Sequence, residues 1–168
     1  MILVWMVVFG TTTAIIGTAL VLRARFVAVQ VEGASMEPML RAGDRVLVRR
    51  VRLERVRAGQ VVVFAPPTSE LAVAGNPPWR IKRAAALPGD PVPHARAPGL
   101  PETDRQVPAG WFVALGDNAA HSHDSRALGY IEAEALLGVV VRIMRSSLSA
   151  AGSSPTRSIE REPTAPSG

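Results

Sequence analysis

Residues 26–32 read Phe-Val-Ala-Val-Gln-Val-Glu, a run in which apolar and polar side chains alternate. A period of two is typical of a β-strand with one buried face. Similar short runs follow, separated by Gly- and Pro-containing turns such as those at 42–44, 58–59 and 88–90; the runs lie at 45–51, 60–64, 79–86, 111–115 and 137–144. Because no helical pattern comes between them, the sequence predicts a mainly β domain built on an antiparallel sheet.

A long apolar segment precedes this domain. Residues 2–22 carry no charge, and Arg23 and Arg25 follow them. At about 1.5 Å per helical residue, such a segment is close to the thickness of the hydrocarbon core of a bilayer. A cleaved signal peptide would have a basic start and a shorter apolar core, and a buried core helix is the other alternative. We predict one transmembrane helix over residues 1–22, which places the protein in the cell membrane as a single-pass protein.

Composition excludes several classes of site. The 168 residues include no cysteine, so disulfides and thiol chemistry are excluded. The formal charge is +5, but few residues are aromatic and the arginines form no continuous basic stripe, so we expect no nucleic-acid partner.

Residues 147–168 are rich in Ser, Pro and Arg and are predicted to form a disordered tail, which leaves residues 23–146 as the folded domain.

The chain has one lysine, Lys82, beside eighteen arginines. Arginine stays protonated at any accessible pH, whereas a partly buried lysine can lose its proton and act as a base. The neighbours of Lys82, which include Trp79 and Ile81, favour burial. A surface lysine retained by chance is the alternative, and composition alone would favour it.

A candidate nucleophile lies directly after the first predicted strand. Residues 33–40 read Gly-Ala-Ser-Met-Glu-Pro-Met-Leu. Gly33 allows the backbone to approach a substrate, and Pro38 stiffens the turn that presents Ser35. A serine hydroxyl is a poor nucleophile unless a base takes its proton. A helix-capping serine is the alternative for Ser35.

A dense polar run, Gly-Asp-Asn-Ala-Ala-His-Ser-His-Asp-Ser-Arg, occupies residues 116–126. Polar groups so close together must satisfy one another if they are buried. His121, His123 and Asp124 could instead bind a metal ion, but His94, in a Pro-rich loop, is not a convincing further ligand. We therefore expect no metal.

Together these segments resemble bacterial type I signal peptidases, the Ser–Lys leader peptidases. Four boxes of that family occur in order, over a region of about 26–145: Ser-Met-x-Pro at 35–38, Gly-Asp-x-Val at 43–46, Lys-Arg with Pro-Gly-Asp at 82–90, and Gly-Asp-Asn with Ser-x-Asp-Ser-Arg at 116–126. The chain departs from the family at Met39, Ala86 and Ala119. It also has too few residues between Asp90 and Trp111 for the large accessory β domain of some members.

The resemblance implies a function and residue roles. Ser35 would be the nucleophile and Lys82 the general base, with Ser122 orienting the lysine amine. Gly33, Asp117, Asp124 and Arg126 would support the site, and Met36 and Pro38 would contact substrate. The resemblance implies a membrane-bound serine endopeptidase that removes signal peptides from exported preproteins, without a cofactor. We expect a monomer whose partners are preproteins and membrane lipid.

Other functions stay open at this point. A self-cleaving repressor uses a similar Ser–Lys pair, but it should carry a DNA-binding domain in place of the apolar segment. A dedicated leader or conjugative-transfer peptidase of the same family is compatible with the boxes. A non-enzymatic membrane-tethered β domain is the third alternative. Arg23 and Arg25 after the span favour the cytoplasmic side for the domain by the positive-inside rule. The family resemblance implies the opposite side, and we follow it and expect an extracytoplasmic catalytic domain.

Overall fold

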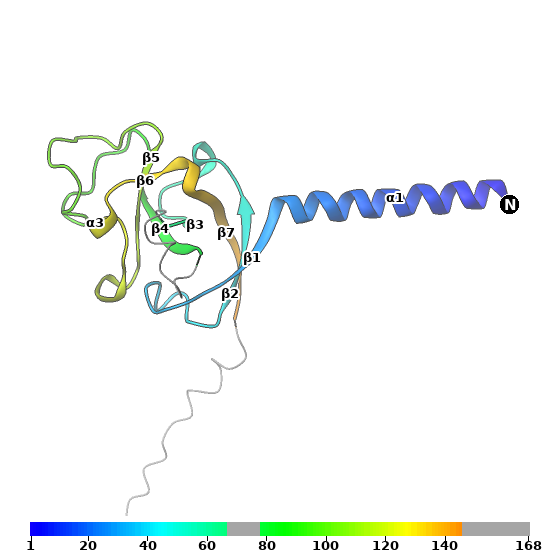
Figure 1. Cartoon of the computed structure of the whole chain (residues 1–168), viewed down its shortest axis with the longest axis horizontal. Helices are drawn as coiled ribbons and strands as arrows, with labels where there is room; N and C mark the ends of the chain where they lie inside the picture. Colours follow the sequence, from blue (N-terminus) through cyan, green and yellow to red (C-terminus); the bar gives the residue numbers. More distant parts are fainter. Residues whose placement is uncertain (67–77, 146–168) are drawn as a thin grey trace, which may run out of the picture.

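A computed structural model describes residues 1–66 and 78–145. Helix α1 (Ile2–Arg25) projects from a β domain and makes contact with it only near its end (Figure 1). Residues Val4–Arg25 of α1 are long and apolar enough to cross a membrane, and none of that segment is buried in the protein. The predicted tail, 147–168, and most of the Pro-rich loop at 65–78 lie outside the described residues.

The domain is one curled, seven-stranded antiparallel sheet. This confirms the predicted fold class, a mainly β domain built on an antiparallel sheet. Along the sheet the strand order is β1-β2-β7-β3-β4-β5-β6. The strands are β1 (Phe26–Gln30), β2 (Arg45–Arg50), β3 (Val61–Phe64), β4 (Arg80–Ala86), β5 (Trp111–Leu115), β6 (Ile131–Glu132) and β7 (Leu136–Met144). Six of them match the predicted runs to within two residues at each end. The sequence did not predict β6, because a two-residue strand has no periodicity to detect.

Short helical turns connect the strands. They are η1 (Leu53–Arg55), η2 (Ala119–His121), α3 (Ser125–Leu128) and η3 (Ala133–Ala135). One of these turns, η2, lies inside the polar run that follows β5, and α3 begins at the end of that run. That run therefore folds back on the sheet within a few residues, and it keeps its polar side chains close to the end of β5.

The centre of the sheet is buried on both faces. In β3 all four residues are buried. Val61 and Val63 pack in one cluster with Met36 and Leu40. Val62 and Phe64 pack in a second cluster. In that second cluster the ring of Phe64 meets Phe112 of β5 edge to face, with 5.9 Å between ring centroids. Packing on both sides fixes β3, and through it the register of β4.

Two strand edges remain open near one another. Strand β1 pairs only with β2, and β5 pairs with β4 only from Arg83 onward. Residues 80–82 of β4 therefore pair with β3 on one side, while their other edge faces a groove. This arrangement exposes backbone hydrogen-bonding groups beside Lys82.

Candidate active site

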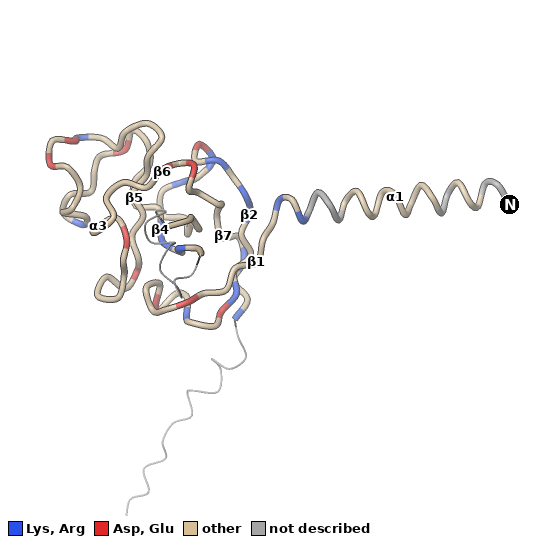
Figure 2. The backbone as a smooth tube through the Cα atoms, viewed as in Figure 1, with Lys and Arg blue, Asp and Glu red and all other residues tan. Residues whose placement is uncertain are grey.

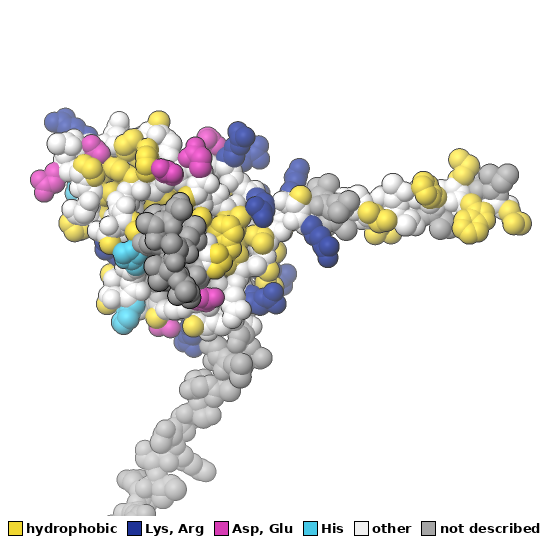
Figure 3. All heavy atoms as spheres, in the orientation of Figure 1, with side chains coloured by type: hydrophobic (Ala, Val, Ile, Leu, Met, Phe, Trp, Pro, Cys, Tyr) yellow, Lys and Arg dark blue, Asp and Glu magenta, His cyan; other side chains and the backbone are white. Residues whose placement is uncertain are grey.

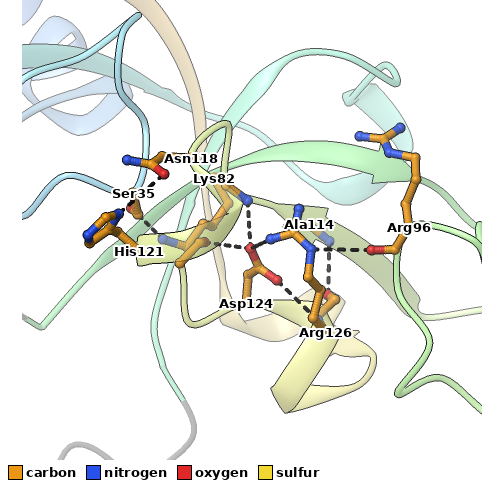
Figure 4. A network of polar contacts seen from close by, with 11 residues as sticks. Ser35, Lys82, Arg96, Ala114, Asn118, His121, Asp124 and Arg126 are labelled. Carbon is orange, nitrogen blue, oxygen red and sulfur yellow. Dashed lines mark hydrogen bonds and ion pairs between the residues drawn. The ribbon is translucent and has the colours of Figure 1, made fainter.

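Ser35 and Lys82 meet directly, although 47 residues separate them in the sequence. Lys82 Nζ donates a hydrogen bond of 2.6 Å to Ser35 Oγ (Figure 4). Lys82 lies on β4 opposite Val62 of β3, and only 3% of its surface is exposed. Burial against the central strand therefore fixes the lysine side chain, as its apolar neighbours in sequence led us to expect.

The turn that carries Ser35 is anchored by its own apolar residues. Met36 and Leu40 are buried in the core on either side of the turn, and Leu40 N–H donates to the carbonyl of Met36. The carbonyl of Ser35 accepts a hydrogen bond of 3.0 Å from the N–H of Asn118. The serine is thus held by the core below it and by the polar run beside it.

The predicted neighbours of Ser35 differ in their placement. Gly33 is exposed and has a φ of +72°, a conformation that glycine adopts without strain. Met36 lines the groove beside Ser35. Pro38 follows a cis peptide bond with Glu37 and is exposed, outside the residues that line the groove.

Burial changes the acid–base chemistry of the lysine. Removal of Lys82 from water disfavours its charged form and lowers its pKa from 10.5 to about 8. Asp124 acts in the opposite direction and raises the pKa, while Arg80 and Arg126 lower it further. About a tenth of the amine is therefore neutral at pH 7, and a neutral amine can accept a proton.

Asp124 is the centre of the polar network beside the lysine. It is fully buried and accepts four hydrogen bonds: from Ser122 Oγ at 2.5 Å, from the N–H of Gly116 at 2.7 Å, and from Nη1 and the N–H of Arg126 at 2.8 and 3.1 Å. The bond from the N–H of Arg126 caps α3, and the ion pair with the guanidinium compensates the buried charge. The carboxylate therefore fixes both Ser122 and the end of β5.

The oxygen of Ser122 can accept a hydrogen bond, but none of the hydrogen bonds of the described residues supplies a donor to it. Its hydroxyl proton goes to Asp124, and the hydrogen bonds of the described residues include none between Ser122 and Lys82. A Cβ added at Gly116 would collide with Ser122 Oγ and with the carbonyl of Ser35. The glycine thus allows Ser122 and the Ser35 turn to lie on either side of one backbone position.

Arg83 is a site residue that the sequence analysis missed. It pairs with Asp117 through two hydrogen bonds of 2.8 and 2.6 Å, and its guanidinium also contacts Met39 and donates to the carbonyl of Gly59. Hydrogen bonding to Asp117 raises the pKa of Arg83. The Lys-Arg box includes Arg83 but does not indicate its partner. The pair with Asp117 links β4 to the polar run that follows β5.

His121, in the run, and His94, in the loop after β4, each lie close to one oxygen atom. His121 Nδ1 lies 3.4 Å from Asn118 Oδ1, and His94 Nε2 lies 2.8 Å from the carbonyl of Asp104. Within residues 1–66 and 78–145, no group of three His, Asp or Glu side chains is arranged to hold a metal ion. The alternative of a metal site therefore gains no support from the geometry.

A groove of about 210 Å³ leads to the Ser35–Lys82 pair. One wall comes from β1 and the residues after it, and the other from the first residues of β4. The lining residues are Ala28, Val29, Gln30, Val31, Glu32, Ser35, Met36, Pro78, Trp79, Arg80, Ile81 and Lys82. Open strand edges on both walls suit an extended peptide, which can pair with either edge through its main chain.

Comparison with known proteins identifies the family. A family model described as "Signal peptidase, peptidase S26" matches residues 2–98 and 94–144. The chain belongs to the signal peptidase family. This confirms the resemblance drawn from the four boxes, and the two matched segments together include every box.

Named relatives agree with the family. The chain is 31% identical over 127 residues to a probable signal peptidase I-2 of Synechocystis sp., and 30% identical over 129 residues to a signal peptidase I of Leptolyngbya laminosa. Each alignment covers 64% of this chain, but only 58% and 63% of those two relatives. Signal peptidase I V of Bacillus subtilis is 25% identical over 150 residues, which cover 70% of this chain and 84% of that protein. This signal peptidase homologue thus spans about three fifths of the length of its cyanobacterial relatives.

The lowered pKa of Lys82 is directly measurable because the chain has one lysine. In protein labelled with [ε-¹³C]lysine and dissolved in detergent micelles, the single side-chain resonance should titrate with a pKa of about 8. The same resonance in denaturant should titrate near 10.5, since unfolding returns the amine to water. A folded-state titration near 10.5 would contradict the described burial of Lys82.

Proposed function

We propose that this protein is a membrane-bound serine endopeptidase that removes N-terminal signal peptides from exported preproteins with a Ser35–Lys82 dyad. The observation that carries the proposal is the 2.6 Å contact between Ser35 Oγ and a buried lysine amine with a lowered pKa. Membership of the signal peptidase family supports the substrate class. The catalytic domain comprises residues 23–146, and a monomer suffices because both members of the dyad come from one chain.

The reaction begins with a reversal of the observed hydrogen bond. When Lys82 has lost its proton, the lone pair of Nζ accepts the proton of Ser35 Oγ. The oxygen then attacks the carbonyl carbon of the scissile peptide bond, the bond to the leaving amine breaks, and that amine takes the proton from Lys82. An acyl-enzyme on Ser35 remains. Neutral Lys82 next takes a proton from a water molecule, and the oxygen of that water attacks the acyl carbon. The bond to Ser35 Oγ then breaks, Ser35 takes the proton back from Lys82, and the new carboxyl group leaves.

The oxyanion of the tetrahedral intermediate needs hydrogen-bond donors that are already in place. The backbone N–H of Ser35 is one candidate donor in the turn, and Gly33 leaves room for the substrate backbone to approach. Gly33 has no hydroxyl to contribute a second donor, so the hole relies mainly on backbone groups. The substrate lies extended in the groove between β1 and residues 80–82.

Ser122 and Asp124 act as positioning residues in this mechanism. Ser122 gives its proton to Asp124, and so its oxygen presents lone pairs that can accept a hydrogen bond from the lysine amine. Asp124 limits the fall of the lysine pKa and, with Arg126, holds Ser122 in place. Asp117 braces the opposite side of Lys82 through Arg83.

Three substitutions test the dyad. Ser35→Ala, Lys82→Ala and Lys82→Arg should each reduce the rate of preprotein cleavage by at least about 10⁴-fold, because members of a catalytic dyad act as a unit. Lys82→Arg keeps the charge but cannot supply a neutral base. Cleavage by the purified full chain would be followed by gel electrophoresis of preproteins.

The control for these variants is Arg105→Lys, an exposed residue in the loop between β4 and β5. This variant should cleave at the wild-type rate, and all four variants should unfold at similar temperatures. Retained cleavage by Lys82→Arg would disprove Lys82 as the base.

The domain lies on the extracytoplasmic side of the membrane, where preproteins emerge. The basic residues in the last turn of α1 favour the opposite side, so the assignment rests on the family. Because the chain has no cysteine, Ala95→Cys introduces a single thiol at an exposed position of the domain. A membrane-impermeant maleimide should label this thiol in intact spheroplasts as fully as in lysed ones. Labelling only after lysis would place the domain in the cytoplasm.

A further inference from the structure

Exposed arginines gather where α1 leaves the β domain. Arg23 and Arg25 occupy the last turn of α1, and basic side chains surround the base of the helix in the space-filling view (Figure 3). The backbone view shows further basic positions along β2 and in the turn that follows it (Figure 2). None of these arginines has a role in the proposed reaction.

Strand pairing brings two parts of the sequence together at this point. Phe26, the first residue of β1, pairs with Arg49 of β2, so the antiparallel register places Arg50 beside the end of α1 at Arg25. Gly138 of β7 lets the backbone of β2 approach closely, since a Cβ there would collide with the carbonyl of Arg49. The sheet therefore fixes Arg49 and Arg50 rather than leaving them on a loose loop.

Beyond β2 the chain forms a shallow hollow lined by Arg50, Val51, Arg52, Arg55 and Leu137, which we call the arginine hollow. Its three arginines are exposed, and no acidic side chain in the described part of the chain makes an ion pair with them. Glu54, the nearest acid in sequence, lines a different hollow together with Leu87 and Asp90. Buried Leu53 anchors the turn, and the three arginines come together around one open hollow.

Such a convergence suits phosphate. The planar guanidinium group donates two parallel hydrogen bonds to phosphate oxygens, and it is less strongly hydrated than an ammonium group. A nucleic acid and an anionic lipid surface both present phosphates. The position beside an apolar helix of membrane-spanning length favours lipid, because the end of such a helix lies at the level of the headgroups.

We propose that Arg23, Arg25, Arg49, Arg50, Arg52 and Arg55 form an arginine collar that binds the headgroup phosphates of anionic phospholipids around α1. The collar rests on the membrane anchoring in the proposed function, but not on the peptidase chemistry. It fixes the β domain against the bilayer at the β2 end of the sheet, in addition to the covalent tether through α1. Each arginine near an anionic surface strengthens lipid association by about fivefold.

The test measures lipid preference in bilayers that contain the full chain. Wild-type protein is reconstituted in phosphatidylcholine, and the association of spin-labelled phosphatidylglycerol is compared with that of spin-labelled phosphatidylcholine. The hollow variant, Arg52→Gln with Arg55→Gln, is compared with a control of equal charge change, Arg105→Gln with Arg145→Gln, at exposed positions away from the collar. Neither pair includes a residue of the proposed dyad or its network.

We expect wild type and control to prefer phosphatidylglycerol equally, and the hollow variant to lose at least about fivefold of that preference. The preference should also disappear in 1 M salt, where the Debye length is about 3 Å. An unchanged preference in the hollow variant would overturn the proposal, and so would an equal loss in both variants, which would indicate net charge alone. DNA binding lost in the hollow variant with lipid preference unchanged would assign the surface to nucleic acid.

The outcome is separable from that of the peptidase proposal. Loss of preprotein cleavage leaves the lipid measurement unaffected, since no substrate is present. Extraction of the full chain from vesicles by alkaline carbonate would overturn membrane anchoring and the collar together, whatever the dyad does.

Discussion

Burial of Lys82 against Ser35 is the constraint on which the rest of the site depends. A charged amine is unfavourable in a position with so little exposure to water. No direct ion pair within the described part of the chain compensates the charge of Lys82, and its pKa is lowered as a result. The position is dry because Lys82 lies beside β3, whose side chains are buried on both faces of the sheet. The fold therefore generates the property that a lysine base requires.

Asp124 adjusts that property without cancelling it. A carboxylate in direct contact with the amine would hold the lysine protonated, but here its oxygens are occupied by Ser122, Gly116 and Arg126. Its charge acts on Lys82 only through space and is partly offset by Arg126 and Arg80. The network thus separates two requirements, a rigid frame for the site and an amine that can lose its proton.

The groove and the dyad share one structural origin. Because β5 pairs with β4 only from Arg83, the strand edge directly before it stays open, and Lys82 is the last residue of that open stretch. An extended peptide that pairs along this edge would bring its backbone to Ser35.

Much of this was readable from the sequence. Short runs with apolar side chains, bounded by Gly- and Pro-containing turns, located six strands, and the boxes located Ser35, Lys82 and the polar run. Strand β6 was not predicted, because it is defined only by its pairing with Trp111 and Phe112. The sequence also did not predict that β3 is buried on both faces, because a short run of valines does not indicate which segments pack against it.

The partners of the site residues were the least predictable part. Arg83 finds Asp117 across 34 residues, and the carbonyl of Ser35 accepts from Asn118 much further along the chain. The boxes placed Ser122 and Asp124 in one run, but they did not reveal that Ser122 donates its proton to Asp124. Such choices depend on distances set by the whole sheet, which no local pattern encodes.

The pH dependence of kcat/KM for preprotein cleavage tests the central claim most directly. If neutral Lys82 is the base, log kcat/KM should rise with a slope of one below a pKa of about 8 and become level above it, because only the deprotonated amine reacts. A profile that is level from pH 6 upward, or one that still rises with unit slope to pH 10, would contradict the account.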